Sequence, residues 1–172
     1  SQDLVYAQYR AYDSLGNMVN IVNIDKKFDL GDAEKPISNK SYVGKIIVDK
    51  PYSLFNYSTI GYQSFFNAPE EIALMNKLFF DGYRLGEVSA DITLVEPILR
   101  DADIVSLDIG TIKSAELSYK NSESPNGFDG REICAIARYA GISNKVTSFG
   151  VYELKDFSEA KNAAMLIAQI FW

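Results

Sequence analysis

The sequence of 172 residues contains no histidine. This absence excludes a histidine general base, a Ser-His-Asp or Cys-His catalytic arrangement within the chain, and a histidine-ligated metal. The single cysteine, Cys134, excludes an internal disulfide and a cysteine-rich zinc site. Any chemistry must therefore come from carboxylate, lysine, tyrosine or serine side chains, or from this one thiol.

Other absences narrow the class of protein. No apolar run approaches the ~20 residues of a membrane span, and a net charge of −6 gives little electrostatic support for nucleic-acid binding. No Gly-x-Gly-x-x-Gly or Walker-type loop follows a predicted strand, which argues against a nucleotide-binding domain. No signal peptide is visible, so we expect a cytoplasmic protein with neither a membrane nor a nucleic-acid partner.

What is present is typical of one globular domain spanning residues 1–172. Short apolar runs predict strands at residues 18–24, 54–61, 103–109 and 146–154. Helical periodicity predicts helices at residues 4–15, 69–80, 92–100, 131–139 and 160–172, with loops at 32–41 and 121–130. This alternation predicts an α/β fold, with a mainly parallel sheet covered by helices on both faces.

Acidic residues follow three of the predicted strands. Asp25, Asp108 and Glu153 stand at strand ends, and Asp29 lies just beyond Asp25. Because the carboxyl ends of parallel strands meet at one edge, where ligands bind, we expect these side chains on one rim. The alternative is structural, because aspartates after strands also cap turns and helices, and Glu153 can equally be an ordinary strand-end residue.

Three segments together resemble a known family. They are Val-Asn-Ile-Asp-Lys-Lys-Phe-Asp at 22–29, Ser-Leu-Asp-Ile-Gly at 106–110 with Pro-Asn-Gly-Phe-Asp-Gly-Arg-Glu at 125–132, and Thr-Ser-Phe-Gly-Val-Tyr-Glu at 147–153. Their order and spacing resemble the arginase, agmatinase and formimidoylglutamase family, the ureohydrolases, and are closest to its formimidoylglutamase-like branch. The resemblance implies a three-layer α/β/α sandwich truncated at the amino-terminal end. The sequence starts at a capping residue and stops inside an apolar helix, so we expect it to be part of a longer protein.

The resemblance also implies a site with two manganese ions at strand ends. The ions lower the pKa of a bridging water, which attacks a guanidino or formimino carbon. The family ligands come from Gly-Gly-Asp-His, Asp-x-His-x-Asp and Ser-x-Asp-x-Asp segments. Here Gln2 stands at the first histidine, Lys27 at the second histidine, and Gly110 at the last aspartate.

One implied metal position keeps a set of oxygen ligands, which are Asp25, Asp29, Asp108 and Gln2. Such a set suits Mg²⁺, Ca²⁺ or Mn²⁺. At the other position we predict that the Lys27 ammonium replaces the metal electrostatically, in direct contact with Asp25 or Asp108. The alternatives are a solvated Lys27, as expected for its neighbour Lys26, and a Gln2 that binds no metal.

The resemblance therefore implies a family domain with a degenerate dinuclear site, inactive in the family hydrolysis. The alternative is an active Mn²⁺-dependent hydrolase of a formimino or guanidino C–N bond, such as that of formimidoylglutamate. In that case Glu153 faces the cationic group of a small amidine or amino-acid-like substrate. Cys134 is expected in core packing, and the apolar residues 170–172 are expected to cover the sheet or a second copy in a homo-oligomer.

Overall fold

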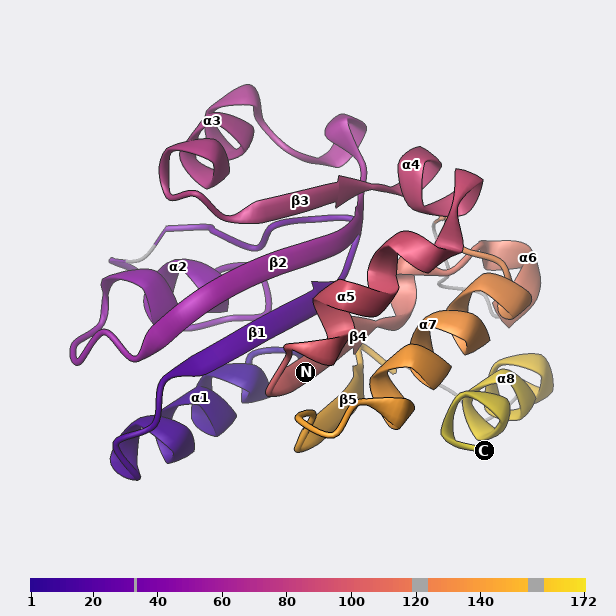
Figure 1. Cartoon of the computed structure of the whole chain (residues 1–172). Helices are drawn as coiled ribbons and strands as arrows, with labels where there is room; N and C mark the ends of the chain where they lie inside the picture. Colours follow the sequence, from indigo (N-terminus) through magenta and orange to yellow (C-terminus); the bar gives the residue numbers. More distant parts are fainter. Residues whose placement is uncertain (33, 119–123, 155–159) are drawn as a thin grey trace.

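The structure, a computed structural model, describes residues 1–32, 34–118, 124–154 and 160–172. Its five strands form one parallel sheet in the order β3-β2-β1-β4-β5 (Figure 1). The strands are β1 (Val19–Ile24), β2 (Leu54–Tyr62), β3 (Asp81–Arg84), β4 (Ile104–Asp108) and β5 (Ser148–Tyr152). The four predicted strands are confirmed with small shifts at their ends. The strand β3 was not predicted, because it is short, contains a glycine and lacks apolar alternation.

Helices connect the strands. They are α1 (Leu4–Ser14), α2 (Tyr42–Val48), α3 (Pro69–Lys77), α4 (Leu85–Ala90), α5 (Val95–Arg100), α6 (Ser114–Leu117), α7 (Gly130–Ile142) and α8 (Lys161–Phe171), with 3₁₀ turns η1 (Ser64–Phe66), η2 (Ile92–Leu94) and η3 (Ile109–Thr111). The predicted helix at 92–100 is divided into η2 and α5. The short helices α2, α4 and α6 were not predicted. The predicted loop at 32–41 includes residue 33, and the loop at 121–130 includes residues 121–123, which lie outside the described residues.

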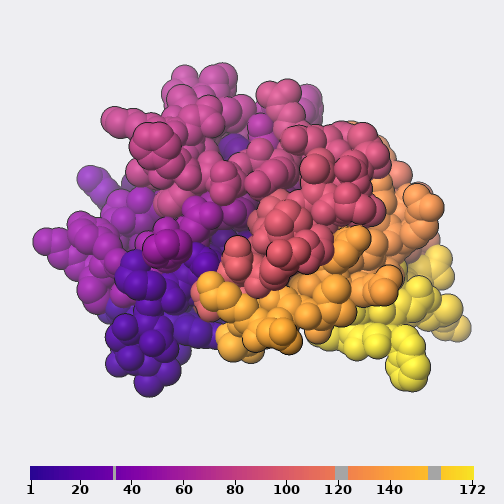
Figure 2. Space-filling view, viewed as in Figure 1, coloured from indigo at the N-terminus to yellow at the C-terminus, as the bar shows by residue number. Residues whose placement is uncertain are grey.

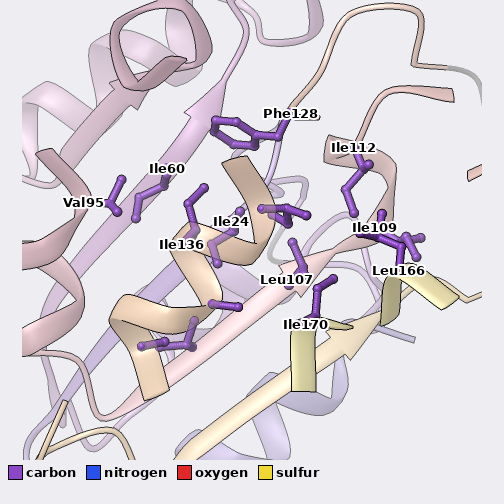
Figure 3. Close-up of a cluster of buried hydrophobic side chains, with 14 of the residues drawn as sticks. Ile24, Ile60, Val95, Leu107, Ile109, Ile112, Phe128, Ile136, Leu166 and Ile170 are labelled. Carbon is purple, nitrogen blue, oxygen red and sulfur yellow. The ribbon is translucent and has the colours of Figure 1, made fainter. Parts of the chain in front are cut away.

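The helices form a layer on each face of the sheet, which confirms the predicted α/β/α sandwich. On one face α4, α5 and α7 bury an aliphatic cluster, and α8 packs against α7. In this cluster Ile24, Ile60 and Leu107 of the strands meet Val95 of α5 and Ile136 of α7 (Figure 3). Burial of such side chains is the main stabilising term of the fold.

The second face has a tyrosine-rich core beneath α1, α2 and α3. Tyr9, Tyr42 and Tyr57 are all fully buried there. The buried Asn23 of β1 donates its side-chain amide to the hydroxyls of Tyr42 and Tyr57. This core therefore combines apolar packing with internal hydrogen bonds, as buried polar groups require.

Two further sequence expectations concern the aliphatic side. Cys134 packs against the aliphatic cluster, and burial raises the pKa of its thiol, which confirms its place in the core. In the segment 170–172, Ile170 packs into the same cluster, whereas Phe171 and Trp172 are exposed. Figure 2 shows the yellow carboxyl-terminal segment and the indigo amino-terminal segment at opposite edges of one face. No helix in the described ranges is long and apolar enough to cross a membrane.

The sheet order places a topological switch beside β1. The chain runs outward from β1 to β2 and β3, then returns to β4 and β5 on the other side of β1 (Figure 1). In the register of the β1–β4 pair, Ile24 lies opposite Leu107. The carboxyl ends of β1 and β4 are therefore neighbours, at the place where open parallel sheets form ligand sites.

Candidate functional site

Three carboxylates gather at this switch point. Asp25 follows β1, and Asp108 is the last residue of β4. Asp29 lies on the loop after β1, with a left-handed backbone at φ 50°. Asp25 and Asp29 are buried, with 1% and 8% of their surface exposed. The structure thus brings together the three aspartates that the sequence predicted as metal ligands.

The carboxylates lie close enough to perturb one another. Burial raises the pKa of Asp25 well above its ordinary value, and the charges of Asp108 and Asp29 raise it further. Burial also raises the pKa of Asp29 to about 7, with the charge of Asp108 adding to the rise, while a side-chain interaction with Asp25 and the charge of Lys27 oppose it. These directions are those expected of carboxyl groups that are buried close to one another.

Gln2 joins the amino terminus to the strand ends. Its side-chain Nε2 donates to Ser106 Oγ on β4 at 3.0 Å, and its backbone nitrogen donates to Glu153 Oε1 at 2.9 Å. Gln2 is fully buried. Its Oε1 and Asp25 Oδ2 are buried without a hydrogen-bond partner among the described residues. Gln2 therefore lies within the predicted site, and its amide oxygen accepts no hydrogen bond from the described residues.

Glu153 directly follows β5 and has a left-handed backbone at φ 61°. Its Oε1 accepts the backbone N–H of Gln2, so this carboxylate holds the amino-terminal segment in place. Glu153 also raises the pKa of Asp29, which places its charge near the aspartates. Its role toward a substrate stays a prediction.

Lys27 does not make the direct contact that the sequence analysis predicted. Ion pairs within 4.0 Å among the described residues do not include Lys27. Its Nζ instead lies 6.0 Å from the centre of the Phe66 ring. The Lys27 backbone N–H donates to Asp25 Oδ1 at 2.9 Å, a turn in which the aspartate bonds two residues ahead. This turn fixes the backbone of Lys27, while the ammonium lowers the pKa of Asp29 without contact.

The neighbouring Lys26 lies at the site, although the sequence analysis treated it as a solvated loop residue. It is half-buried, and its Nζ donates to Ser124 Oγ at 2.6 Å. The same nitrogen lies 4.9 Å from the Phe66 ring centre and 3.6 Å from the point where a Cβ on Gly110 would lie. Ser124 and Phe66 are remote in sequence, so no local signal could identify these contacts.

Asn67 fixes the loop that carries both lysines. Its Oδ1 accepts the backbone N–H of Phe28 at 2.9 Å, and its Nδ2 donates to the carbonyls of Lys26 and Gln63 at 2.9 and 2.8 Å. Asn67 is buried, so these bonds are shielded from competing water. The backbone direction at Lys26 is thus set by the segment that follows β2.

Comparison with known proteins identifies the fold. Neither a protein-family model nor a curated protein matches the sequence. The structure matches Trypanosoma cruzi formiminoglutamase, solved with Mn²⁺, at a TM-score of 0.88 and 14% identity, covering 99% of this chain and 60% of that chain. This chain has the formiminoglutamase fold.

Two more solved structures of this fold agree. Formimidoylglutamase from Bacillus subtilis matches at a TM-score of 0.83 and 14% identity, covering 99% of this chain and 56% of that chain. Entamoeba histolytica arginase in complex with L-ornithine matches at a TM-score of 0.69 and 15% identity, covering 91% of this chain and 60% of that chain. This formiminoglutamase-fold chain therefore spans less than two thirds of the length of these structures.

The residues present in this formiminoglutamase fold do not fit a two-manganese centre. Across the described ranges, no three His, Cys, Asp or Glu side chains are grouped closely enough to hold a metal ion. The ligand position at Gly110 has no side chain, and the ammonium of Lys27 cannot ligate a metal. Among the site oxygens, Asp25 Oδ2 and Gln2 Oε1 are buried without a hydrogen-bond partner in the described part of the chain.

Proposed function

We propose that this chain is a ureohydrolase-family domain with a degenerate dinuclear site that does not hydrolyse amidines. The observation that carries the proposal is the disposition of the site carboxylates. Asp25, Asp29 and Asp108 converge on the switch point, yet the described residues include no three-ligand metal group. The formiminoglutamase fold supports the family, and the three sequence segments support it independently.

The chemical consequence follows from what metal ions supply in hydrolysis. A metal ion lowers the pKa of bound water and so generates a nucleophile at neutral pH. The sequence contains no histidine that could act instead as a general base near neutral pH. We therefore assign the domain to a role in binding or assembly. The homo-oligomer and the cytoplasmic location stay predictions from the sequence.

One observation favours a second candidate, an active single-metal hydrolase of a formimino or guanidino C–N bond. Asp25 Oδ2 and Gln2 Oε1 are both buried and accept no hydrogen bond from the described part of the chain. In this alternative the two oxygens would hold Mn²⁺ with Asp29 and Asp108, and Glu153 would orient a small amidine substrate. A bound cation would satisfy both oxygens, as buried polar atoms require.

A hydrolysis assay separates the two candidates. The purified chain is incubated with Mn²⁺ and formimidoylglutamate, or with Mn²⁺ and arginine, and formamide or urea is measured. We expect release no faster than with the Asp25→Asn variant, because no ion is held to activate water. A formiminoglutamase with the same fold serves as the positive control. Mn²⁺-dependent turnover that Asp25→Asn abolishes would overturn the proposed function in favour of the single-metal hydrolase.

A further inference from the structure

The surroundings of Gly110 bring a lysine side chain near one of the site carboxylates. The point where a Cβ would lie on Gly110 is 3.1 Å from Asp108 Oδ1 and 3.6 Å from Lys26 Nζ. One point therefore lies within 4 Å of both a site carboxylate and an ammonium. In the sequence, Gly110 occupies the place of the last aspartate of the Ser-x-Asp-x-Asp segment.

Resting on the proposed function, we propose that the Lys26 ammonium is the fixed cation that takes the place of the second metal ion. A single positive charge there would attract the Asp108 carboxylate, which lies near the same point, and would offset part of the negative charge at the strand ends. It also repels a divalent cation from the same space. The glycine at position 110 thus leaves out a metal ligand, and Lys26 supplies a positive charge in the same place.

The ammonium is held in place by groups from three separate segments. Ser124 Oγ accepts its hydrogen bond at 2.6 Å, and Ser124 in turn donates to the Gly110 carbonyl at 2.5 Å. The Phe66 ring lies 4.9 Å from Nζ, within the range of a cation–π contact. Ser124 is 1% exposed, so its bond to Lys26 is protected from water. These contacts hold Lys26 Nζ in one position beside Gly110.

Lys27 provides a matched comparison, because it carries the same charge one residue away. Its Nζ lies 6.0 Å from the Phe66 ring, and the hydrogen bonds found among the described residues include one from Lys26 Nζ but none from Lys27 Nζ. Neither lysine takes part in an ion pair within 4.0 Å there. It is also not among the three heavy atoms nearest to the Cβ position of Gly110, whereas Lys26 is. If a positive charge anywhere in this loop sufficed, the two lysines would be interchangeable.

The test restores the missing ligand and then removes each lysine in turn. Mn²⁺ affinity is measured by electron paramagnetic resonance titration for Gly110→Asp, Lys26→Met/Gly110→Asp and Lys27→Met/Gly110→Asp. We expect Gly110→Asp alone to gain little affinity, because the new carboxylate pairs with Lys26. We expect the Lys26→Met double variant to bind Mn²⁺ at least ~10-fold more tightly than Gly110→Asp. The Lys27→Met double variant should remain within ~3-fold of Gly110→Asp.

Folding and charge are controlled within the same series. Circular dichroism melting verifies that each variant is folded. Lys26→Gln/Gly110→Asp keeps an N–H donor toward Ser124 without the charge, and should reproduce the gain. Lys26→Arg/Gly110→Asp keeps the charge and should show none.

The outcomes distinguish this proposal from the one on which it rests. An equal gain from the Lys26→Met and Lys27→Met double variants, or no gain from either Lys26→Met or Lys26→Gln, would overturn the role of Lys26. The degenerate-site proposal would survive that result if the wild-type chain binds no Mn²⁺. Two Mn²⁺ ions bound by the wild-type chain would instead overturn the degenerate site itself.

Discussion

The free energy of unfolding should fall as the pH rises from about 4 to about 8, by up to about 4 kcal/mol from Asp29 alone. The pKa of Asp29 is raised by burial from 3.8 to about 7 in the folded chain. Between these pH values the folded state binds more protons than the unfolded state. The contribution of Asp29 is therefore fully present below pH 3.8 and is lost as the pH rises through about 7. The raised pKa of Asp25 acts in the same direction.

This effect is measured by urea unfolding of the wild-type chain and of the Asp29→Asn variant, at about pH 4, 6 and 8. Asparagine is suited to the position, because it tolerates the left-handed backbone of Asp29 at φ 50°. The variant should match the wild type at about pH 4 and exceed it by a few kcal/mol at about pH 8. Asp32→Asn is the control, because Asp32 is exposed and its pKa is lowered by the Glu34 backbone N–H.

A free energy of unfolding that rises with pH over this range would indicate a bound cation at the site. A bound divalent cation lowers the pKa of the carboxylates around it, so stability would then rise with pH over this range. Parallel pH profiles of the wild type and Asp29→Asn would show that Asp29 carries no shifted proton. Either result would contradict the account of buried carboxyls compensated by protons and by a lysine.

Replacing Phe128 by alanine should lower the free energy of unfolding by about 3–5 kcal/mol. The Phe128 ring is fully buried in the aliphatic cluster (Figure 3). It fills the space beside Gly61, where an added Cβ would lie 2.4 Å from the ring. Its backbone also pairs with the segment after β4, through bonds to the Thr111 carbonyl and the Lys113 N–H. The cavity left by alanine would therefore lie beside Gly61, near the carboxyl end of β2.

The control for this prediction is Phe65→Ala. Phe65 is 89% exposed, and its replacement should change stability by less than about 0.5 kcal/mol. Both variants are compared with the wild type by urea unfolding, with equal slopes as the criterion of two-state behaviour. A loss below about 1 kcal/mol for Phe128→Ala would contradict the close packing of the ring against Gly61.

The fold was predictable because its strands are strong local signals. The runs ending at Asp25, Asp108 and Glu153 are apolar and short, and parallel strands place such ends at one edge. The edge strand β3 was not predicted because Asp81–Arg84 lacks the alternation of apolar and polar residues that indicates a strand. Similarly, α2 is a short helix whose stability comes from tertiary packing of its buried tyrosine and isoleucine, and not from sequence propensity.

The place of the three aspartates in the fold was predictable from the sequence, whereas the contacts of the two lysines were not. The spacing of Asp25 and Asp29 is a local property, and it was enough to place both aspartates after the first predicted strand. The choice between Lys26 and Lys27 depends on contacts with Phe66 and Ser124, which other segments supply. Such long-range contacts leave no trace in the spacing of adjacent residues, so spacing alone does not distinguish Lys26 from Lys27.

The most direct test of the degenerate site is the metal content of the wild-type chain. The purified protein is dialysed to equilibrium against Mn²⁺, and the bound metal per chain is measured by inductively coupled plasma mass spectrometry. Asp25→Asn/Asp108→Asn provides the background of nonspecific binding. The account predicts no bound Mn²⁺ above that background, and two Mn²⁺ ions per chain, lost in the double variant, would contradict it.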